Sequence, residues 1–67
     1  MPKPIIDAST EGTVYRGYAP IGTGQGEPGW RIERETTANG ITITEYPQGD
    51  MSFNFVWDDR TAYLYSR

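Results

Sequence analysis

The sequence contains neither cysteine nor histidine, and these two absences exclude much familiar chemistry. Disulfide bridges cannot form, the usual Cys/His zinc site has no ligands, and nucleophile–base pairs that depend on these residues cannot be built. A small domain commonly uses a disulfide, a metal or a partner to compensate for its limited core. With the first two removed, the composition favours a chain that a partner stabilises.

Basic residues are also few: six Lys and Arg face nine Asp and Glu, which gives a formal net charge of −3. They are scattered singly, so the basic patch typical of a nucleic-acid-binding protein is missing, and we expect no nucleic-acid partner. No apolar run approaches the roughly 18 residues of a membrane-spanning helix, and the N-terminus lacks the order of a signal peptide. We therefore expect no membrane partner and a cytosol-like compartment for synthesis.

Aromatic residues, by contrast, are plentiful for a short chain. The 67 residues include two Trp, five Tyr and two Phe. A domain of this length buries only about 60% of the surface that its unfolded chain exposes, so its core is small. Large amphipathic side chains are typical of interfaces, and their number favours contact with other proteins.

The stretch Trp30–Tyr46 has the clearest structural pattern in the chain. Two alternating runs meet at Asn39-Gly40, the strongest local signal for a β-hairpin with a type I′ turn. This turn fixes the register, and the predicted cross-strand pairs are Ala38–Ile41, Thr36–Ile43 and Arg34–Glu45. One face is then predicted to belong to the core, with Trp30, Ile32, Ile41 and Ile43, while the Thr-lined and charged face sees water.

Shorter patterns complete an all-β prediction. Residues 51–57 fit both a two-residue and a helical period, and we favour a strand that ends in a turn at Asp58 and Asp59. The other expected elements are a strand at 13–19, a Gly- and Pro-rich loop at 20–29 and a last strand at 61–66. The sequence thus predicts one domain over residues 13–67, a single small antiparallel sheet or curled barrel of four to five short strands.

Residues 1–12 are predicted to form an extended N-terminal arm. Pro2 and Pro4 lack N–H donors and push their predecessors into extended geometry. Only Ile5 and Ile6 offer apolar anchors. Two interpretations stay open: a disordered terminus, or an arm that docks on a neighbouring chain.

Candidate catalytic and ligand-binding motifs are weak. Gly24–Gly29 formally matches G-x-G-x-x-G, but Pro28 and a β pattern follow where a phosphate-binding loop needs a helix, so we interpret it as a flexible loop. Asp58 and Asp59 are typical turn residues and lack the spacing of a calcium loop. We predict no catalytic residue, no cofactor and no metal, and hence no enzyme.

Residue types that are common at protein interfaces are concentrated near the C-terminus. Trp, Tyr and Arg are common at the energetic centres of interfaces, and Ile5 and Ile6 add apolar groups from the arm. The predicted protein-interface residues are Trp57, Arg60, Tyr63, Tyr65, Ile5 and Ile6. Alternatives remain: Trp57 as core, Arg60 paired with Asp58 or stacked on an aromatic ring, and a Trp and Tyr platform for carbohydrate.

Three segments form an ordered set of motifs: Tyr15–Thr23, Trp30–Arg34 and Val56–Arg60, closed by Tyr65-Ser66. In this order they resemble a group of short, mostly uncharacterised proteins encoded by tailed bacteriophages and associated with the virion. The resemblance covers roughly residues 14 to 66. Two features depart from it: the segment between Thr23 and Trp30 is rich in Gly instead of Ala and Ser, and Phe55 stands where a polar residue is expected.

The resemblance implies a function without catalysis. It implies a structural protein of the virion, in the tail, neck or capsid, made in the host cytoplasm and present in many copies. Its partners would be other virion proteins and further copies of itself. The alternative is a small binding module that recognises a host protein or a surface glycan.

Overall fold

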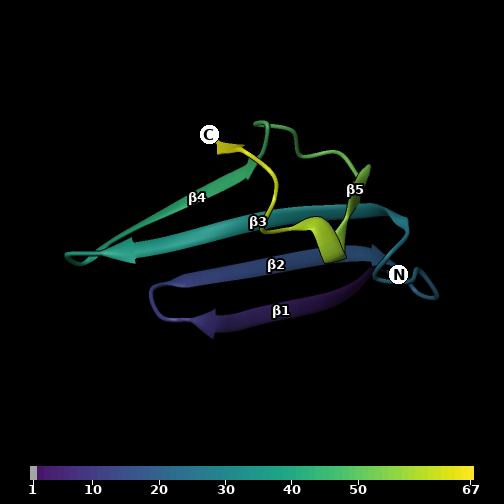
Figure 1. The fold of residues 1–67 in the computed structure, drawn as a ribbon, viewed down its shortest axis with the longest axis horizontal. Coiled ribbons are helices and arrows are strands. Elements are labelled where there is room, and N and C mark those ends of the chain that lie inside the picture. Colours follow the sequence, from purple (N-terminus) through teal and green to yellow (C-terminus); the bar gives the residue numbers. More distant parts are fainter. Residues whose placement is uncertain (1) are drawn as a thin grey trace.

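The computed structural model describes residues 2–67, with side chains from Ile5 onward, and all its regular elements but one short 3-10 turn are β-strands (Figure 1). They form one open antiparallel sheet of six strands, in the order β1-β2-β3-β4-β6, with β5 paired to β3. The all-β prediction is confirmed. The elements are β1 (Pro2–Thr10), β2 (Thr13–Pro20), β3 (Pro28–Ala38), β4 (Ile41–Pro47), β5 (Phe55–Val56), the 3-10 turn η1 (Trp57–Asp59) and β6 (Tyr65–Ser66).

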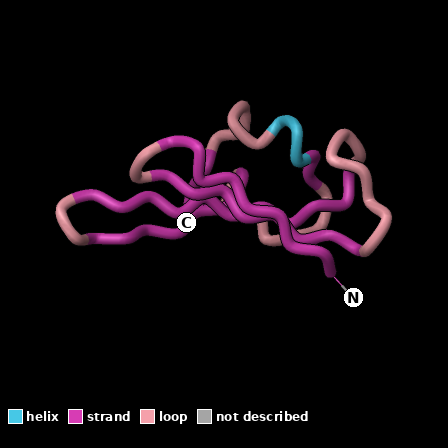
Figure 2. The backbone as a smooth tube through the Cα atoms, turned by 90° about the horizontal axis from the view of Figure 1, so that it is seen from below, coloured by secondary structure: helices cyan, strands magenta, loops and turns pink. Residues whose placement is uncertain are grey.

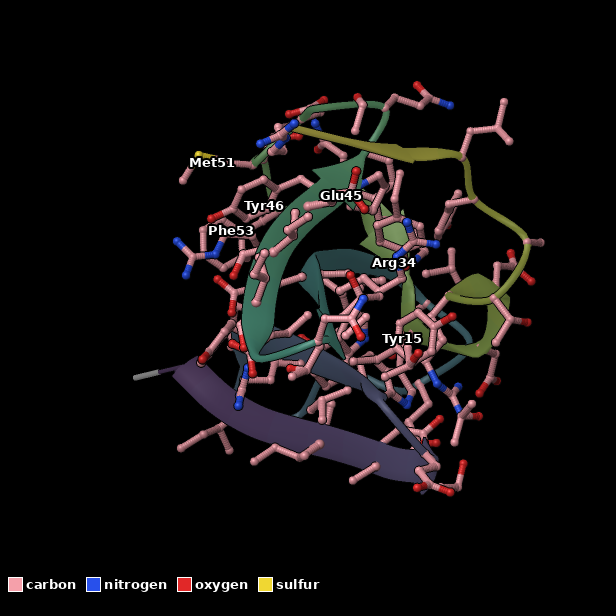
Figure 3. The ribbon with its side chains drawn as sticks, turned by 90° about the vertical axis from the view of Figure 1, so that its left-hand side faces the viewer. Tyr15, Arg34, Glu45, Tyr46, Met51 and Phe53 are labelled. Carbon is pink, nitrogen blue, oxygen red and sulfur yellow. The ribbon has the colours of Figure 1, made fainter. Side chains whose placement is uncertain are left out.

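The sheet curls around its core but does not close into a barrel. Seen end on, the strands wrap from β1 through β4 towards β6, whereas β1 and β6 stand at opposite ends of the strand order (Figure 3). Closure requires strands long enough to bridge the two edges, and β5 and β6 have only two residues each. The sheet alternative is therefore correct, the barrel alternative is wrong, and the strands number six instead of four or five.

The extra strand is β1, which occupies most of the predicted arm. Its pairs with β2 run from Pro2–Pro20 to Asp7–Tyr15, followed by an irregularity before Thr10–Thr13. The extended conformation is as predicted, but the segment belongs to the sheet of its own chain instead of lying outside the β domain. Prolines are tolerated there because β1 is an edge strand, where half of the backbone N–H groups need no ladder partner.

The pairing of β3 with β4 follows the sequence pattern. Its cross-strand pairs include the three expected ones, Ala38–Ile41, Thr36–Ile43 and Arg34–Glu45. Between the strands, Asn39 and Gly40 have φ angles of 53° and 77°. A type I′ turn requires positive φ at both of its central residues, and Asn and Gly tolerate that conformation best.

The core lies on the concave face of the sheet, beneath the C-terminal segment. Its buried hydrophobic residues are Ala19, Trp30, Ile32, Phe55 and Trp57, with Ile5, Tyr15, Tyr63 and Tyr65 packed against them. Of the two isoleucines of β4 expected in this set, Ile43 is only half-buried and lies outside it, and Ile41 is 64% exposed. It lies at the end of the β3–β4 pair that points away from β5 and η1, so the C-terminal segment does not cover it (Figure 1).

The segment after β4 departs most from the sequence prediction. Residues 51–54 are not a strand, because the Ser52 N–H donates to the Asp50 carboxylate at 2.8 Å and the Asn54 side chain donates to the Ser52 hydroxyl. Such local side-chain bonds compete with a β-ladder. The predicted strand at 61–66 is likewise reduced to β6, since the Ala62 N–H donates to the Asp59 carbonyl in a turn. The turn expected at Asp58 and Asp59 is present as part of η1, which stands above one face of the sheet (Figure 2).

Candidate functional site

Trp57, the first of the predicted interface residues, belongs to the core. It is 2% exposed, and its ring centroid lies 6.0 Å from that of Trp30. The ring packs over Gly17, where a Cβ would lie 2.5 Å from Cε3 of Trp57. A side chain held in this way is part of the core of the single chain, which agrees with the core interpretation of Trp57.

Arg60 is engaged within the chain. Its Nε and Nη2 atoms lie 3.0 and 2.9 Å from Oδ2 of Asp7, and Nη1 donates to the Trp57 carbonyl at 3.1 Å. The guanidinium carbon also lies 4.6 Å from the centroid of the Trp57 ring. Sequence reasoning had offered Asp58 as its partner, whereas the fold supplies Asp7. Arg60 therefore fastens the C-terminal segment to β1.

The Asp7 carboxylate accepts hydrogen bonds from Ser9 as well as from Arg60. The donor–acceptor distances are 2.6 Å for the Ser9 hydroxyl and 3.0 Å for the Ser9 N–H. The two Ser9 bonds first, and then Arg60, lower the pKa of Asp7 from its ordinary 3.8 to about 2. The group stays ionised near neutral pH and acts as an acceptor, which suits a structural bond better than proton transfer.

The two C-terminal tyrosines also turn inward. The Tyr63 hydroxyl accepts the Val56 N–H at 2.9 Å, and its ring meets Phe55 edge to face at 5.1 Å. The Tyr65 hydroxyl donates to the Arg60 carbonyl at 2.7 Å, and burial raises the pKa of Tyr65. The outward side of this segment instead presents Leu64, which is 83% exposed.

A half-buried ion pair stands at the open end of the core (Figure 3). Arg34 Nη2 donates to Glu45 Oε1 at 2.6 Å, and its guanidinium carbon lies 4.6 Å from the Tyr65 ring centroid. The Tyr15 ring lies 5.9 Å from that of Tyr65. The charges neutralise each other, and the flanking groups are phenols, so the arrangement braces the sheet and lacks a nucleophile–base pair.

The convex face carries an aromatic cluster that sequence reasoning missed. The guanidinium carbon of Arg31 lies 5.0 Å from the Tyr18 ring centroid and 5.8 Å from that of Phe53. Phe53 and Met51 are 48% and 53% exposed, and both are drawn on the same side of β4 as Tyr46 (Figure 3). Pairing residues 13–19 with 30–36 would have placed Tyr18 beside Arg31, but no local pattern brings Phe53 to them. We call Tyr18, Arg31, Tyr46, Met51 and Phe53 the convex aromatic patch.

The two isoleucines of β1 have different environments. Ile5 packs against the core, whereas Ile6 is 62% exposed. Ile6 is therefore the more accessible of the two for contact with a partner. The described residues expose six large hydrophobic side chains in all, namely Ile6, Ile21, Ile41, Met51, Phe53 and Leu64.

The Gly-rich loop between β2 and β3 is closed by its own hydrogen bonds. The Gly24 N–H donates to the Glu27 carboxylate at 2.6 Å, and Trp30 Nε1 donates to the Gly24 carbonyl at 2.9 Å. A carboxylate thus occupies the N–H group that a phosphate would use. Within the described residues, no group of three or more acidic side chains is placed to hold a metal ion.

The part of the chain that the structure describes contains no helix of sufficient length and apolarity to cross a membrane. No protein-family model, curated protein or solved structure matches this chain.

Proposed function

We propose that this chain is a non-enzymatic structural protein of a tailed-phage virion, a tail, neck or capsid accessory subunit that acts through protein–protein contacts. The observation that carries the proposal is the open sheet. Among the side chains that the structure describes, a core of five buried hydrophobic residues is combined with six exposed large hydrophobic ones, and the sheet has two edges. The ordered resemblance to small virion-associated β proteins supplies the virion context.

The internal contacts support an assembly role over catalysis. The polar atoms of Arg60, Tyr63 and Tyr65 are hydrogen-bonded to backbone and side-chain partners within the chain. The two backbone edges and the exposed apolar side chains remain for contact, and both suit the burial of one protein against another. Binding to the folded form by neighbouring subunits would also stabilise a domain with so small a core.

Quantitative mass spectrometry of purified phage particles tests this proposal. The chain should be present in a fixed ratio to the major tail or capsid proteins, and the isolated chain should be oligomeric or of low stability. Its absence from particles, combined with a monomeric isolated chain that unfolds in one sharp transition, would contradict the proposal.

A second function is favoured by the convex aromatic patch, which would make the chain a binding module for a host protein or surface glycan. Exposed rings beside a guanidinium are typical of surfaces that stack on sugars or on partner side chains. Phe53 is the most accessible aromatic group there, with 48% of its surface exposed.

Glycan-array and pull-down binding by the isolated chain distinguish the two functions. The binding module requires that Phe53→Ala abolishes binding while the circular dichroism spectrum is unchanged. Leu64→Ala is the matched control, because Leu64 is also exposed but lies in the C-terminal segment. Equal binding by both variants, or no binding by the wild type, would exclude the patch as a recognition site.

A further inference from the structure

The two edges of the sheet differ in their capacity to accept another strand. Hydrogen-bonding residues alternate along an antiparallel strand, so every second residue directs its N–H and C=O towards one neighbour. The Thr37 N–H donates to the Gly12 carbonyl at 2.9 Å, which fixes this alternation for β2 and β3. The residue pairs between neighbouring strands carry this alternation on to β1 and β4. They show which backbone groups of these two strands point away from the sheet.

The β1 edge is partly blocked. Val14, Arg16 and Tyr18 bond towards β3, so the alternate residues of β2 bond towards β1, where they face Lys3, Ile5 and Asp7. The outward positions of β1 are then Pro2, Pro4 and Ile6. Since proline has no N–H, Ile6 offers the one outward donor of the regular stretch from Pro2 to Asp7, and a second strand finds little to bind there.

The β4 edge is open where β6 does not reach it. Ala38 and Ile41 close the β3–β4 connection, so the backbone groups of Thr42 and Thr44 point away from β3. Within the described residues, β6 pairs with β4 only at Tyr46 and Pro47. Figure 1 shows β6 near one end of β4, while the rest of that edge is bare.

This open edge lacks the usual protection against pairing. Natural edge strands commonly carry charged residues, proline or a bulge. The segment 36–44 contains none of the fifteen charged residues of the chain and no proline. The edge residues themselves are β-branched, and Ile41 is 64% exposed.

We propose that a second copy of this chain pairs with the β4 edge, antiparallel and with a twofold axis at Thr42. This register brings Thr42 opposite Thr42 of the second copy, and each Ile41 opposite the partner's Ile43. The two isoleucine pairs cover Ile41, which is exposed in the single chain, and Ile43, which is half-buried. The hydrogen bonds are made by the outward backbone groups of Thr42 and Thr44. Because no charge lies at the contact, the like-charged copies do not repel one another there.

The register also agrees with the surroundings of the edge. It uses residues 40–44, so the partner strand stops short of Tyr46, which is already paired with Ser66. A closed twofold pair is expected instead of a filament, because the opposite edge at β1 is blocked by its prolines and cannot continue the sheet.

This inference deepens the proposed function and rests on it for the multi-copy role, but the two can fail separately. Sedimentation of the purified full chain reports self-association, whereas particle mass spectrometry reports virion location. A chain that is present in particles yet monomeric in solution would overturn the edge pairing alone.

Sedimentation equilibrium of wild type and three variants tests the pairing. Thr42→Pro removes an outward N–H and should raise the dimer dissociation constant by at least about tenfold. Ile6→Pro, the matched change on the β1 edge, and Thr42→Val, which retains the backbone donor, should leave the dimer intact. A wild type that stays monomeric up to about 1 mM, or equal losses from the two proline variants, would overturn the proposal.

Hydrogen exchange of the wild type keeps the test valid if Thr42→Pro fails to fold. The Thr42 and Thr44 amides should exchange more slowly in concentrated than in dilute solution, while the Ile6 amide should exchange at the same rate in both. Exchange of Thr42 and Thr44 that is independent of concentration in a dimeric sample would place the contact elsewhere.

Discussion

The indole ring of Trp57 occupies the space that a side chain on Gly17 would need. A Cβ built on Gly17 would stand 2.5 Å from Cε3 of Trp57 and 3.0 Å from Cγ2 of Ile5. Unlike Gly12, Gly22, Gly29, Gly40 and Gly49, Gly17 does not have a positive φ. Its role is therefore steric: it allows the C-terminal segment to seat its Trp directly on the backbone of β2.

Replacement of Gly17 by alanine should therefore destabilise the fold through overpacking. We expect Gly17→Ala to lower the free energy of unfolding by about 2 kcal/mol, because neither a core indole nor the backbone can yield cheaply. Urea denaturation followed by Trp fluorescence measures the loss. Gly26→Ala is the matched control, since the nearest atom to a Cβ there is an Asp58 carboxylate oxygen at 3.4 Å. Equal midpoints for the two variants would contradict the steric role.

At Gly40 the same substitution should act through a different cause, because its φ is 77° and a Cβ would meet nothing within 4 Å. Gly40→Ala should cost about 1 kcal/mol, through the strain of a left-handed backbone and without any clash. Asn39→Gly keeps the required conformation accessible and should change the free energy of unfolding by a few tenths of a kcal/mol only. A neutral Gly40→Ala would show that the connection adopts another turn in solution.

The Asp7 carboxylate should make stability depend on acid pH. Its pKa is lowered in the folded chain, so the unfolded chain binds the proton more readily and folding gains stability above the ordinary value of 3.8. That gain is lost as the pH falls from 3.8 to about 2. The difference in urea midpoint between wild type and Asp7→Asn should accordingly be largest near neutral pH and shrink across this window.

A change at Ser9 tests the cause of the lowered Asp7 pKa. The Ser9 hydroxyl bond is the largest cause of the lowered Asp7 pKa. Ser9→Ala should therefore narrow the pH range over which the stability contribution of Asp7 is lost. A wild type and an Asp7→Asn variant that differ by the same amount at all pH values would contradict the assignment.

The Tyr63 hydroxyl should carry a measurable part of the stability. It satisfies the Val56 N–H at 2.9 Å, in the two-residue strand that covers the core. Tyr63→Phe leaves this donor without its acceptor and should cost about 1 to 2 kcal/mol, while the edge-to-face contact with Phe55 is retained. Chemical denaturation measures the loss. Tyr46→Phe, on the convex side, should be neutral, and similar losses for both variants would argue against a specific bond.

The pairing of β3 with β4 was predictable from sequence because its information is local. A two-residue connection of Asn and Gly fixes the register of everything that flanks it, and the alternation of Trp30 and Ile32 with charged residues fixes the buried face. The turn at Asp58 and Asp59 was predictable for the same reason.

Apart from the strands expected at 51–54 and 61–66, which local hydrogen bonds replace, the errors concern contacts between distant parts of the chain. Residues 2–10 form a strand because β2 provides a ladder, which no pattern within those residues discloses. Arg60 is joined to Asp7, 53 residues away in sequence, although Asp58 is much nearer along the chain. The convex aromatic patch likewise depends on Phe53 arriving from a loop beside Arg31 of β3.

The sequence by itself determined the β class, the register around Asn39-Gly40 and the exclusion of Cys- and His-based chemistry, because composition, turn residues and two-residue periodicity act over short distances. Only the tertiary structure decided that the sheet stays open, that Trp57, Tyr63 and Tyr65 face inward, and that β4 keeps a bare edge. These features depend on which surfaces the C-terminal segment covers. That choice is made by packing between residues far apart in the chain, such as Trp57 on Gly17.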